Sequence, residues 1–259
     1  MHILRRRLGM VAAGIDVATL SINYTGAHQD YGVVQMNDGD YRLLAFTSSG
    51  TLSIEQPVNC EVCVVGGGAN GANAGGGTGG AGGYLKNQSV SAYNGGSVVV
   101  GARQGISSIA DVSVNAVSGQ NGGTGGGGYD NGNGGTGDGL SKYPFGDATY
   151  TLWASKPHCA GGGGGVARYK QGDRSYDYYT GGNGGTNGGN GNKSTYWGSS
   201  GPTYSGTPGT GGTYGGGLGG ASNRDGSNAT YYGSAGGGSA ATQGSGYQGI
   251  VYMRIPVNQ

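Results

Sequence analysis

The sequence contains few of the residues that build an ordinary hydrophobic core. Of its 259 residues only 2 are phenylalanine, 6 are proline and 3 are cysteine, while 34% are hydrophobic and 10% are charged. A formal net charge of +1 argues against nucleic-acid binding, which needs a basic surface. No apolar run reaches the roughly 20 residues that span a bilayer, so we expect no membrane insertion.

The residues that form catalytic and metal sites are also scarce. The histidines, His2, His28 and His158, are isolated, and the sequence shows no nucleophile–base motif, zinc motif or spaced carboxylate pair. Cys60 and Cys63 form a CxxC pair, but strand positions three apart face opposite sides of a sheet, which disfavours a shared metal or a disulfide. We therefore expect no enzyme activity, no cofactor and no metal, and we expect buried cysteines that act as small apolar side chains.

Glycine takes the place of the missing apolar side chains. The chain has 66 glycines among its 259 residues, which is about a quarter. Glycine makes up roughly 7% of an ordinary domain. Low charge and 19 tyrosines do not match the composition of disordered segments. We therefore expect the glycines to form an ordered structure that packs through its backbone.

The glycines recur at every third position. The series are Gly68, Gly71, Ala74, Gly77, Gly80 and Gly83; Gly122, Gly125, Gly128, Gly134 and Gly137; and Gly182, Gly185, Gly188 and Gly191. Period three is the repeat of the polyproline II helix, and neither the α-helix nor the β-strand has it. Collagen is excluded because the runs are short and nearly free of proline. Short glycine helices can instead pack side by side through backbone hydrogen bonds.

Apolar residues gather at the two ends of the chain. Residues 249–255 read as a clear strand, which we expect to pair with a strand of the first region such as residues 61–65. The expected regions are a small antiparallel β attachment region at 1–65, a sandwich of polyglycine II helices with long loops at 66–249, and a closing strand and tail at 250–259. Essentially no α-helix is expected.

The strands of the first region are expected to be short. Turn-forming residues at 37–40 and 56–59 interrupt its apolar segments. The expected strands cover residues 15–24, 32–36, 41–46, 51–54 and 61–65. These segments predict a small antiparallel sheet.

One motif imitates a cofactor site. Residues 62–71 read as a hydrophobic strand followed by GxGxxG, the order of a dinucleotide-binding fingerprint. That fingerprint needs a helix after the glycines, and residues 72–80 are too rich in glycine to form one. No acidic residue follows until Asp111, so we expect no dinucleotide to bind here.

Tyrosine and tryptophan gather between the glycine runs. Together with Ser, Gly and Asn, these rings resemble the composition of antibody-like binding surfaces, and loops on a rigid scaffold often carry binding residues. The candidate receptor-binding residues are Tyr143, Phe145, Tyr150, Trp153, Tyr169, Tyr176, Tyr178, Tyr179, Tyr196, Trp197, Tyr204, Tyr231 and Tyr232. A competing interpretation is that the rings wedge between glycine helices as the available core, and the two interpretations are compatible.

Three segments carry a resemblance to a known family. They are YRLLAFTSSGTL at 41–52, VCVVGGG at 62–68 and GIVY at 249–252. With the glycine runs between them, they are similar to the glycine-rich domain common in phage and prophage tail proteins. The interrupted glycine motifs and Tyr-rich loops also resemble the distal tail-fibre adhesins of T-even-like phages. Residues 1–40 do not resemble the attachment domain of those adhesins, so the docking partner stays open.

The resemblance implies a polyglycine II sandwich whose loop tips bind a bacterial outer-membrane protein or surface glycan. It also implies an N-terminal region that attaches to a tail-fibre or baseplate protein, a place at the fibre tip of the virion, and assembly in the host cytoplasm. Alternatives are a structural tail cap or decoration protein without a receptor, an ice-binding glycine-helix protein, and a glycan depolymerase. We expect the start of the chain, with Arg5, Arg6 and Arg7 before an apolar run cut short at Asp16, to be a docking arm rather than a cleaved signal.

Overall fold

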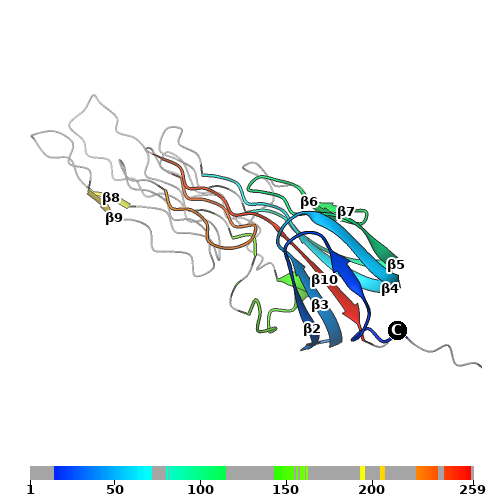
Figure 1. The fold of residues 1–259 in the computed structure, drawn as a ribbon. Coiled ribbons are helices and arrows are strands. Elements are labelled where there is room, and N and C mark those ends of the chain that lie inside the picture. Colours follow the sequence, from blue (N-terminus) through cyan, green and yellow to red (C-terminus); the bar gives the residue numbers. More distant parts are fainter. Residues whose placement is uncertain are drawn as a thin grey trace, which may run out of the picture.

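The computed structural model describes residues 15–71, 80, 82–114, 143–154, 156, 158–160, 162, 193–195, 205–207, 226–238 and 242–257. Within these residues the secondary structure is β, apart from the short 3-10 turn η1 (Pro144–Gly146). None of the described residues forms a helix that is long and apolar enough to cross a membrane. The expected β architecture without α-helix is therefore confirmed for this part of the chain, and Figure 1 shows glycine-rich segments running away from one end of the sheet.

The main element is an eight-stranded antiparallel sheet. Its strands follow the order β2 (His28–Met36), β3 (Gly39–Phe46), β10 (Ile250–Pro256), β4 (Gly50–Val65), β5 (Leu85–Val99), β6 (Ser107–Ile109) and β7 (Val112–Val114). Outside this order, β1 (Ile22–Tyr24) pairs with β4. A separate two-stranded sheet consists of β8 (Lys193–Thr195) and β9 (Ser205–Thr207).

The closing strand β10 lies inside the sheet, between β3 and β4. Opposite β4, Ile250 pairs with Val65 and Arg254 pairs with Glu61. The expected pairing of the C-terminal strand with the first region is therefore confirmed. Every residue of β10 from Ile250 to Ile255 is buried, which is why this strand reads as an almost continuous apolar run.

Strand β4 is longer than its sequence pattern predicts. A single 16-residue strand covers Gly50–Val65, so the break expected at residues 56–59 was wrong. The register against β5 shifts between Ser53 and Val58, and again between Val58 and Cys60. The turn-forming residues are therefore accommodated as bulges within one strand.

The sheet also extends beyond the expected first region. Strands β5, β6 and β7 come from the range that was assigned to the glycine-rich region. Most residues of β5 are exposed, and its sequence is polar, so no apolar alternation marks it as a strand.

Apolar side chains are buried on both faces of the sheet. The first core includes Leu44, Phe46, Leu52, Cys60, Val62, Val64, Val98, Val251 and Met253. The second core includes Tyr41, Leu43, Cys63, Val65, Trp153, Cys159, Ile250 and Tyr252. Cys60 and Cys63 are free, buried thiols on opposite faces of β4, as the spacing of the pair predicts.

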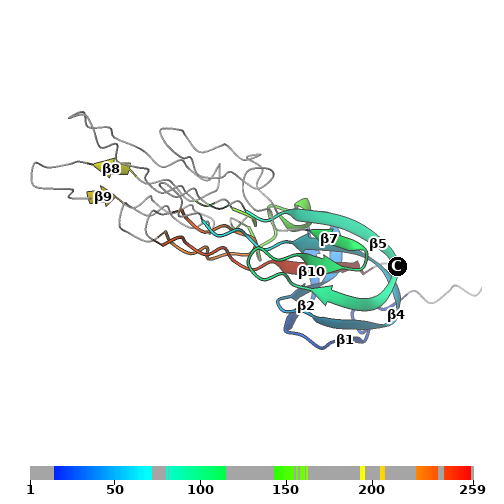
Figure 2. The ribbon, with the colours of Figure 1, turned by 90° about the horizontal axis from the view of Figure 1, so that it is seen from above.

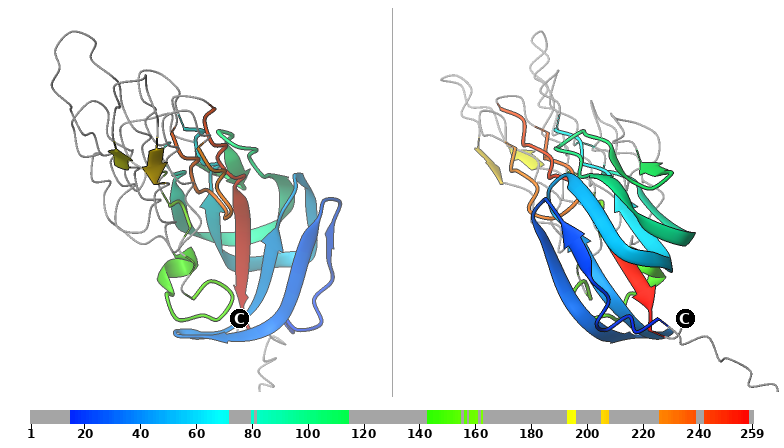
Figure 3. Two further views of the ribbon diagram at one scale, coloured as in Figure 1. Left: turned by 90° about the vertical axis from the view of Figure 1, so that its left-hand side faces the viewer. Right: turned by 45° about the vertical axis from the view of Figure 1, so that its right-hand side comes forward.

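Both ends of the described chain lie at the same end of the sheet, which we call the sheet pole (Figures 1 and 3). Near the N-terminal end, the guanidinium of Arg42 donates to the carbonyl of Val17 at 3.1 Å and pairs with Asp30 at 2.6 Å. Val17 and Leu20 are buried in the first core. The start of the described chain is thus anchored to the sheet by packing and by a charged clamp.

Glycine-rich segments continue from the other end of the sheet, which we call the glycine pole. Figure 2 shows the segments next to β4, β5 and β10 running together away from the strands. Residues 233–238 make backbone hydrogen bonds with several neighbouring segments at once. These neighbours are residues 66–71, 80 with 82–84, 158–160, 226–230 and 242–249.

The hydrogen bonds between these segments recur at every third residue. The carbonyl of Gly233 accepts from the N–H of Gly83 at 2.6 Å. Three residues later, the carbonyl of Gly236 accepts from the N–H of Gly80 at 2.9 Å. A β ladder alternates with a period of two, so these bonds instead follow the period of the glycine series. The described glycines of the first series all donate such bonds: Gly68, Gly71, Gly80 and Gly83.

The packed glycines leave no room for a side chain. A Cβ atom at Gly68 would lie 2.0 Å from the carbonyl oxygen of Ser234, and one at Gly236 would lie 2.1 Å from that of Gly244. Both distances are far below the 3.0 Å that real Cβ contacts respect. Because the obstacle is backbone, a substitution would have to push whole segments apart.

We predict that Gly236→Ala destabilises the chain by about 3 kcal/mol or prevents folding, because the new methyl group overlaps neighbouring backbone. The matched control is Gly146→Ala, since Gly146 has φ +72° and nothing within 4 Å of an added Cβ. Only backbone strain opposes that change, so its expected cost is about 1 kcal/mol. Denaturant unfolding of the purified variants measures both costs, and equal values would contradict the packing of the glycine segments.

Candidate functional site

The candidate receptor-binding residues divide into two groups. Tyr169, Tyr176, Tyr178, Tyr179, Tyr196, Trp197 and Tyr204 lie outside the described residues. The structure describes Tyr143, Phe145, Tyr150, Trp153, Tyr231 and Tyr232. Trp153 belongs to the second core, Tyr143, Phe145, Tyr150 and Tyr232 pack against it, and Tyr231 packs against His158 and Tyr232.

Trp153 is a core residue, so its assignment to a binding surface is corrected. Its side chain is 0% exposed, and its indole N–H donates to the carbonyl of Asp147 at 2.6 Å. The ring packs edge-on against Tyr150 and Tyr252, with centroids 4.8 Å and 5.2 Å away. Because no part of the indole reaches solvent, Trp153 packs beneath the surface residues and cannot contact a partner.

Phe145 and Tyr41 adjoin a buried arginine. The guanidinium of Arg254 lies 4.7 Å from the centroid of the Phe145 ring and 4.1 Å from that of Tyr41. It also pairs with Asp38 and Glu61, each at 2.7 Å. Arg254 is 3% exposed, so its charge is neutralised by the two carboxylates and by the electron-rich faces of the rings.

The turn that carries Phe145 is fastened to the sheet at both ends. The backbone N–H of Phe145 donates to the side-chain oxygen of Asn87 on β5 at 3.0 Å. The carboxylate of Asp147 accepts from the backbone N–H of Asn37 at 3.2 Å and from that of Tyr150 at 3.1 Å. Figure 3 shows this segment, in green, lying against the sheet. The part of the chain that presents Tyr150 is therefore held in place.

A row of aromatic rings, which we call the aromatic row, runs from the second core to the surface. In each neighbouring pair, the ring centroids lie at a separation typical of packed aromatic rings. The pairs are Tyr150–Trp153 at 4.8 Å, Trp153–Tyr252 at 5.2 Å, Tyr252–His158 at 5.6 Å, His158–Tyr231 at 5.0 Å, Tyr231–Tyr232 at 5.4 Å and Tyr232–Tyr247 at 5.6 Å. The row couples the tyrosines of the glycine segments to the packing of the sheet.

His158 is the titratable group at the centre of this row. It is 1% exposed, and its Nε2 atom lies 3.0 Å from the hydroxyl of Tyr252. Its Nδ1 atom has no hydrogen-bond partner among the described residues. Burial lowers the pKa of His158 to about 3, because the charged imidazolium would lose its hydration.

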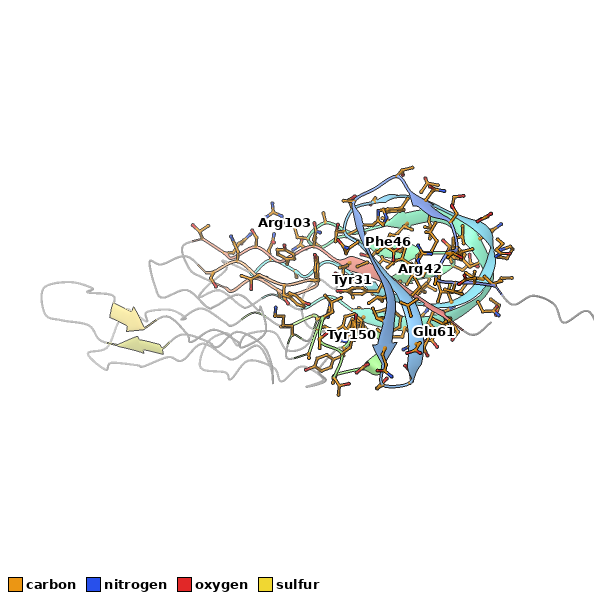
Figure 4. The ribbon with its side chains drawn as sticks, turned by 60° about the horizontal axis from the view of Figure 1, so that its bottom comes forward. Tyr31, Arg42, Phe46, Glu61, Arg103 and Tyr150 are labelled. Atoms are coloured by element: carbon orange, nitrogen blue, oxygen red, sulfur yellow. The ribbon has the colours of Figure 1, made fainter. Side chains whose placement is uncertain are left out.

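The exposed end of the site contains two tyrosines that the sequence analysis did not select. Tyr31 is 38% exposed and Tyr247 is 37% exposed. Tyr31 lies at a bulge of β2 where the register against β3 shifts between Asp30 and Val33, and Figure 4 shows it and Tyr150 near the junction with the glycine segments. The signal for Tyr31 was weak, because Gly32 interrupts the strand pattern beside it.

Tyr31 lies close to the tyrosines of the aromatic row. Burial, and to a smaller extent the Tyr31 phenol, raises the pKa of Tyr150. Burial, then the Tyr247 and Tyr31 phenols, raises the pKa of Tyr232. Burial, then the Tyr232 and Tyr31 phenols, raises the pKa of Tyr231 to about 12.

The described residues contain no group of three or more His, Cys, Asp or Glu that could hold a metal ion. Comparisons with protein-family models, with curated proteins and with solved structures find no match to this chain. What the site can do chemically is set by its residues: neutral phenols and apolar rings, with the imidazole buried behind them. Such a surface suits non-covalent contact through stacking and hydrogen bonding.

We predict that burial of His158 makes stability fall with acidification. The folded pKa of about 3 lies below the unfolded value of 6.5, so this contribution is fully present above pH 6.5 and is lost as the pH falls toward 3. Between pH 6.5 and 5 the free energy of unfolding should fall by about 1.5 kcal/mol more in the wild type than in His158→Gln.

Urea unfolding at a series of pH values measures this difference. The matched control is Tyr252→Phe, which removes the hydroxyl partner of His158 but leaves the imidazole buried. Its pH dependence should stay close to that of the wild type. A His158→Gln variant that loses stability as steeply as the wild type would contradict the prediction.

Proposed function

We propose that this chain is a receptor-binding adhesin at the tip of a bacteriophage tail fibre, where it binds an outer-membrane protein or a surface glycan of the bacterium. The observation that carries the proposal is that the two ends of the described molecule differ in structure. The two ends of the described chain lie at the sheet pole, while the described glycine segments run from the opposite end toward the β8–β9 sheet (Figures 1 and 2). Such a molecule has one end suited to attachment and another suited to display.

The glycine-rich region of the proposed adhesin is a sandwich of polyglycine II helices. A threefold helix turns by about 120° per residue, so successive N–H groups point to different neighbours. In agreement with this geometry, the N–H groups of Ala235, Gly236 and Gly237 donate to three different segments. Their acceptors are the carbonyls of Ala160, Ala69 and Ser227.

Rigidity is what makes this scaffold useful for recognition. Each glycine segment is fixed by hydrogen bonds to its neighbours and by the absence of space around its Cα atoms. Loops held by such a block lose less conformational entropy when they bind a receptor. The Tyr- and Trp-rich segments then act as the recognition elements, with rings for contact area and small polar residues for hydrogen bonds.

The sheet pole is the proposed attachment end. The described residues at the start of the chain are fastened to the sheet by the buried Val17 and Leu20 and by a hydrogen bond from Arg42 to Val17. We propose that this region docks on a tail-fibre or baseplate protein, so that the glycine pole points away from the virion.

The decisive experiment measures binding of the purified chain to intact bacteria. We predict that the wild type binds a defined set of strains, and that this set changes when residues 166–180 are replaced by a Gly/Ser segment of equal length. The unfolding midpoint should change by less than about 2 °C, because a surface recognition loop, the role that we propose for this segment, would contribute little to stability.

The strain panel should include mutants that each lack one surface protein or glycan, since loss of binding to one mutant names the receptor. Val33→Ala on β2 is the matched control, because Val33 is 48% exposed at the sheet and should not affect strain choice. A chain that binds no bacteria but is needed for particle assembly would contradict the proposal and favour a structural tail-cap protein.

A further inference from the structure

The C-terminal part of the described chain lies at the centre of both the sheet and the packed glycine segments. We call residues 226–238 and 242–257 the C-terminal strap (Figure 1, orange and red). In the sheet, the strap contributes β10, which lies between β3 and β4. Beyond the sheet, its glycine-rich part bonds to residues 66–71 and 158–160. These neighbours all precede the strap in the sequence, so the ribosome synthesises them first.

The sheet is divided when the strap is absent. Within the described sheet, β3 and β4 do not pair with each other, and each of them pairs with β10 instead. Strand β10 places Val251 and Met253 in the first core, and it places Ile250 and Tyr252 in the second. A chain without the strap would therefore leave one edge of β3 and one edge of β4 unpaired, and both cores would be open to water.

The strap also supplies the positive charge that joins the strands on either side of β10. Arg254 is 3% exposed and lies 2.7 Å from Asp38, in the turn between β2 and β3. It lies 2.7 Å from Glu61, on β4. One guanidinium thus connects the two sides of the sheet, and it does so only when β10 is in place.

The glycine segments depend on the strap in the same way. The described glycines of the first period-three series each donate a backbone hydrogen bond to it. The donors are Gly68, Gly71, Gly80 and Gly83, and their acceptors are the carbonyls of Tyr247, Gly244, Gly236 and Gly233, at 2.9, 2.9, 2.9 and 2.6 Å respectively. A glycine segment without these acceptors keeps its N–H groups in water, because ordering it would cost entropy without forming the bonds.

We propose that the C-terminal strap closes the fold last, so that the chain becomes ordered after the strap has left the ribosome and not during its synthesis. The parts of a chain that are synthesised first generally fold first. Here those parts lack the strand that joins β3 to β4 and the acceptors of the first glycine series. The most local pairing, β4 with β5, is a two-stranded unit, and such a unit is marginally stable by itself.

The strap thereby acts as a check on chain completion. A chain whose synthesis stops before residues 226–257 obtains neither the closed sheet nor the rigid glycine segments. This inference goes beyond the proposed adhesin function and does not depend on it, because it follows from the order of the contacts along the chain.

The test follows folding of the intact chain on stalled ribosomes. Gly/Ser linkers of increasing length are added after residue 259, so that the strap is either held inside the ribosomal tunnel or released from it. With the strap held back, thermolysin should cleave the chain about tenfold or more faster than with the strap released. Resistance should appear over a narrow range of linker lengths, as residues 250–255 emerge.

Two deletions in the released chain separate the strap from chain length. Deletion of residues 250–259 removes β10 and should speed cleavage by about tenfold or more. Deletion of residues 1–14 removes a longer segment but none of the described contacts, and cleavage should stay within about twofold of the wild type. Should the first deletion give an insoluble chain, the ribosome-bound series still decides the question, because it uses the intact chain.

Three results would overturn the inference. They are a protease-resistant sheet while the strap is still in the tunnel, a resistant chain that lacks residues 250–259, and equal sensitivity of the two deletion chains. Binding to bacteria is a separate outcome. A chain that folds only after release of the strap but binds no cells would remove the adhesin function and leave the role of the strap standing.

Discussion

The backbone hydrogen bond between glycine segments is the interaction on which the rest of the structure depends. In an ordinary domain, apolar side chains fill the interior and the backbone is satisfied within helices or sheets. Here the carbonyl of Gly236 meets the N–H of Gly80 at 2.9 Å, and the space that a side chain would need at Gly236 is filled by the backbone of Gly244. The hydrogen bonds and the exclusion of side chains require each other, because segments can approach closely enough to bond only where no Cβ intervenes. Glycine loses much conformational entropy in such a fixed arrangement, so the segments are stable only as a group.

The sheet provides the surface on which this group can form. The first glycine bond beyond β4, from Gly66 to Tyr84 at 2.9 Å, directly follows the last sheet pair of Val65 with Leu85. Strand β10 enters the sheet next to Gly249, whose N–H donates to Gly101 at 2.9 Å. The glycine segments therefore begin already aligned by strands that a conventional core holds in place. That arrangement reduces the entropy lost when the segments come together, and it explains why the apolar residues are concentrated at the two ends of the chain.

The sequence was informative wherever a local pattern reflected the final environment. The apolar run of β10 predicted a buried strand and its partner β4, the spacing of Cys60 and Cys63 predicted opposite faces, and the glycine period matched the spacing of the backbone bonds. The pattern failed where tertiary contacts decide. Strand β5 is polar and mostly exposed, and its pairing with β4 and β6 makes it a strand. Residues 56–59 carry turn chemistry, but the bulges that absorb them are visible only in the register of two strands.

The aromatic residues show the same limit in the candidate site. Composition alone gave Trp153 and Tyr231 the same role, but burial separates them, since Trp153 is enclosed by the second core while Tyr231 is partly exposed. The chain has few other large apolar residues, so the buried rings that pack against the sheet also fix the positions of the neighbouring rings that reach solvent. Trp153, Tyr252 and His158 form the buried part of one aromatic row whose last member, Tyr247, is exposed. Such a surface is rigid because its exposed rings pack directly against rings of the buried core. The shortage of conventional core residues therefore links the stability of the fold to the geometry of its candidate binding surface.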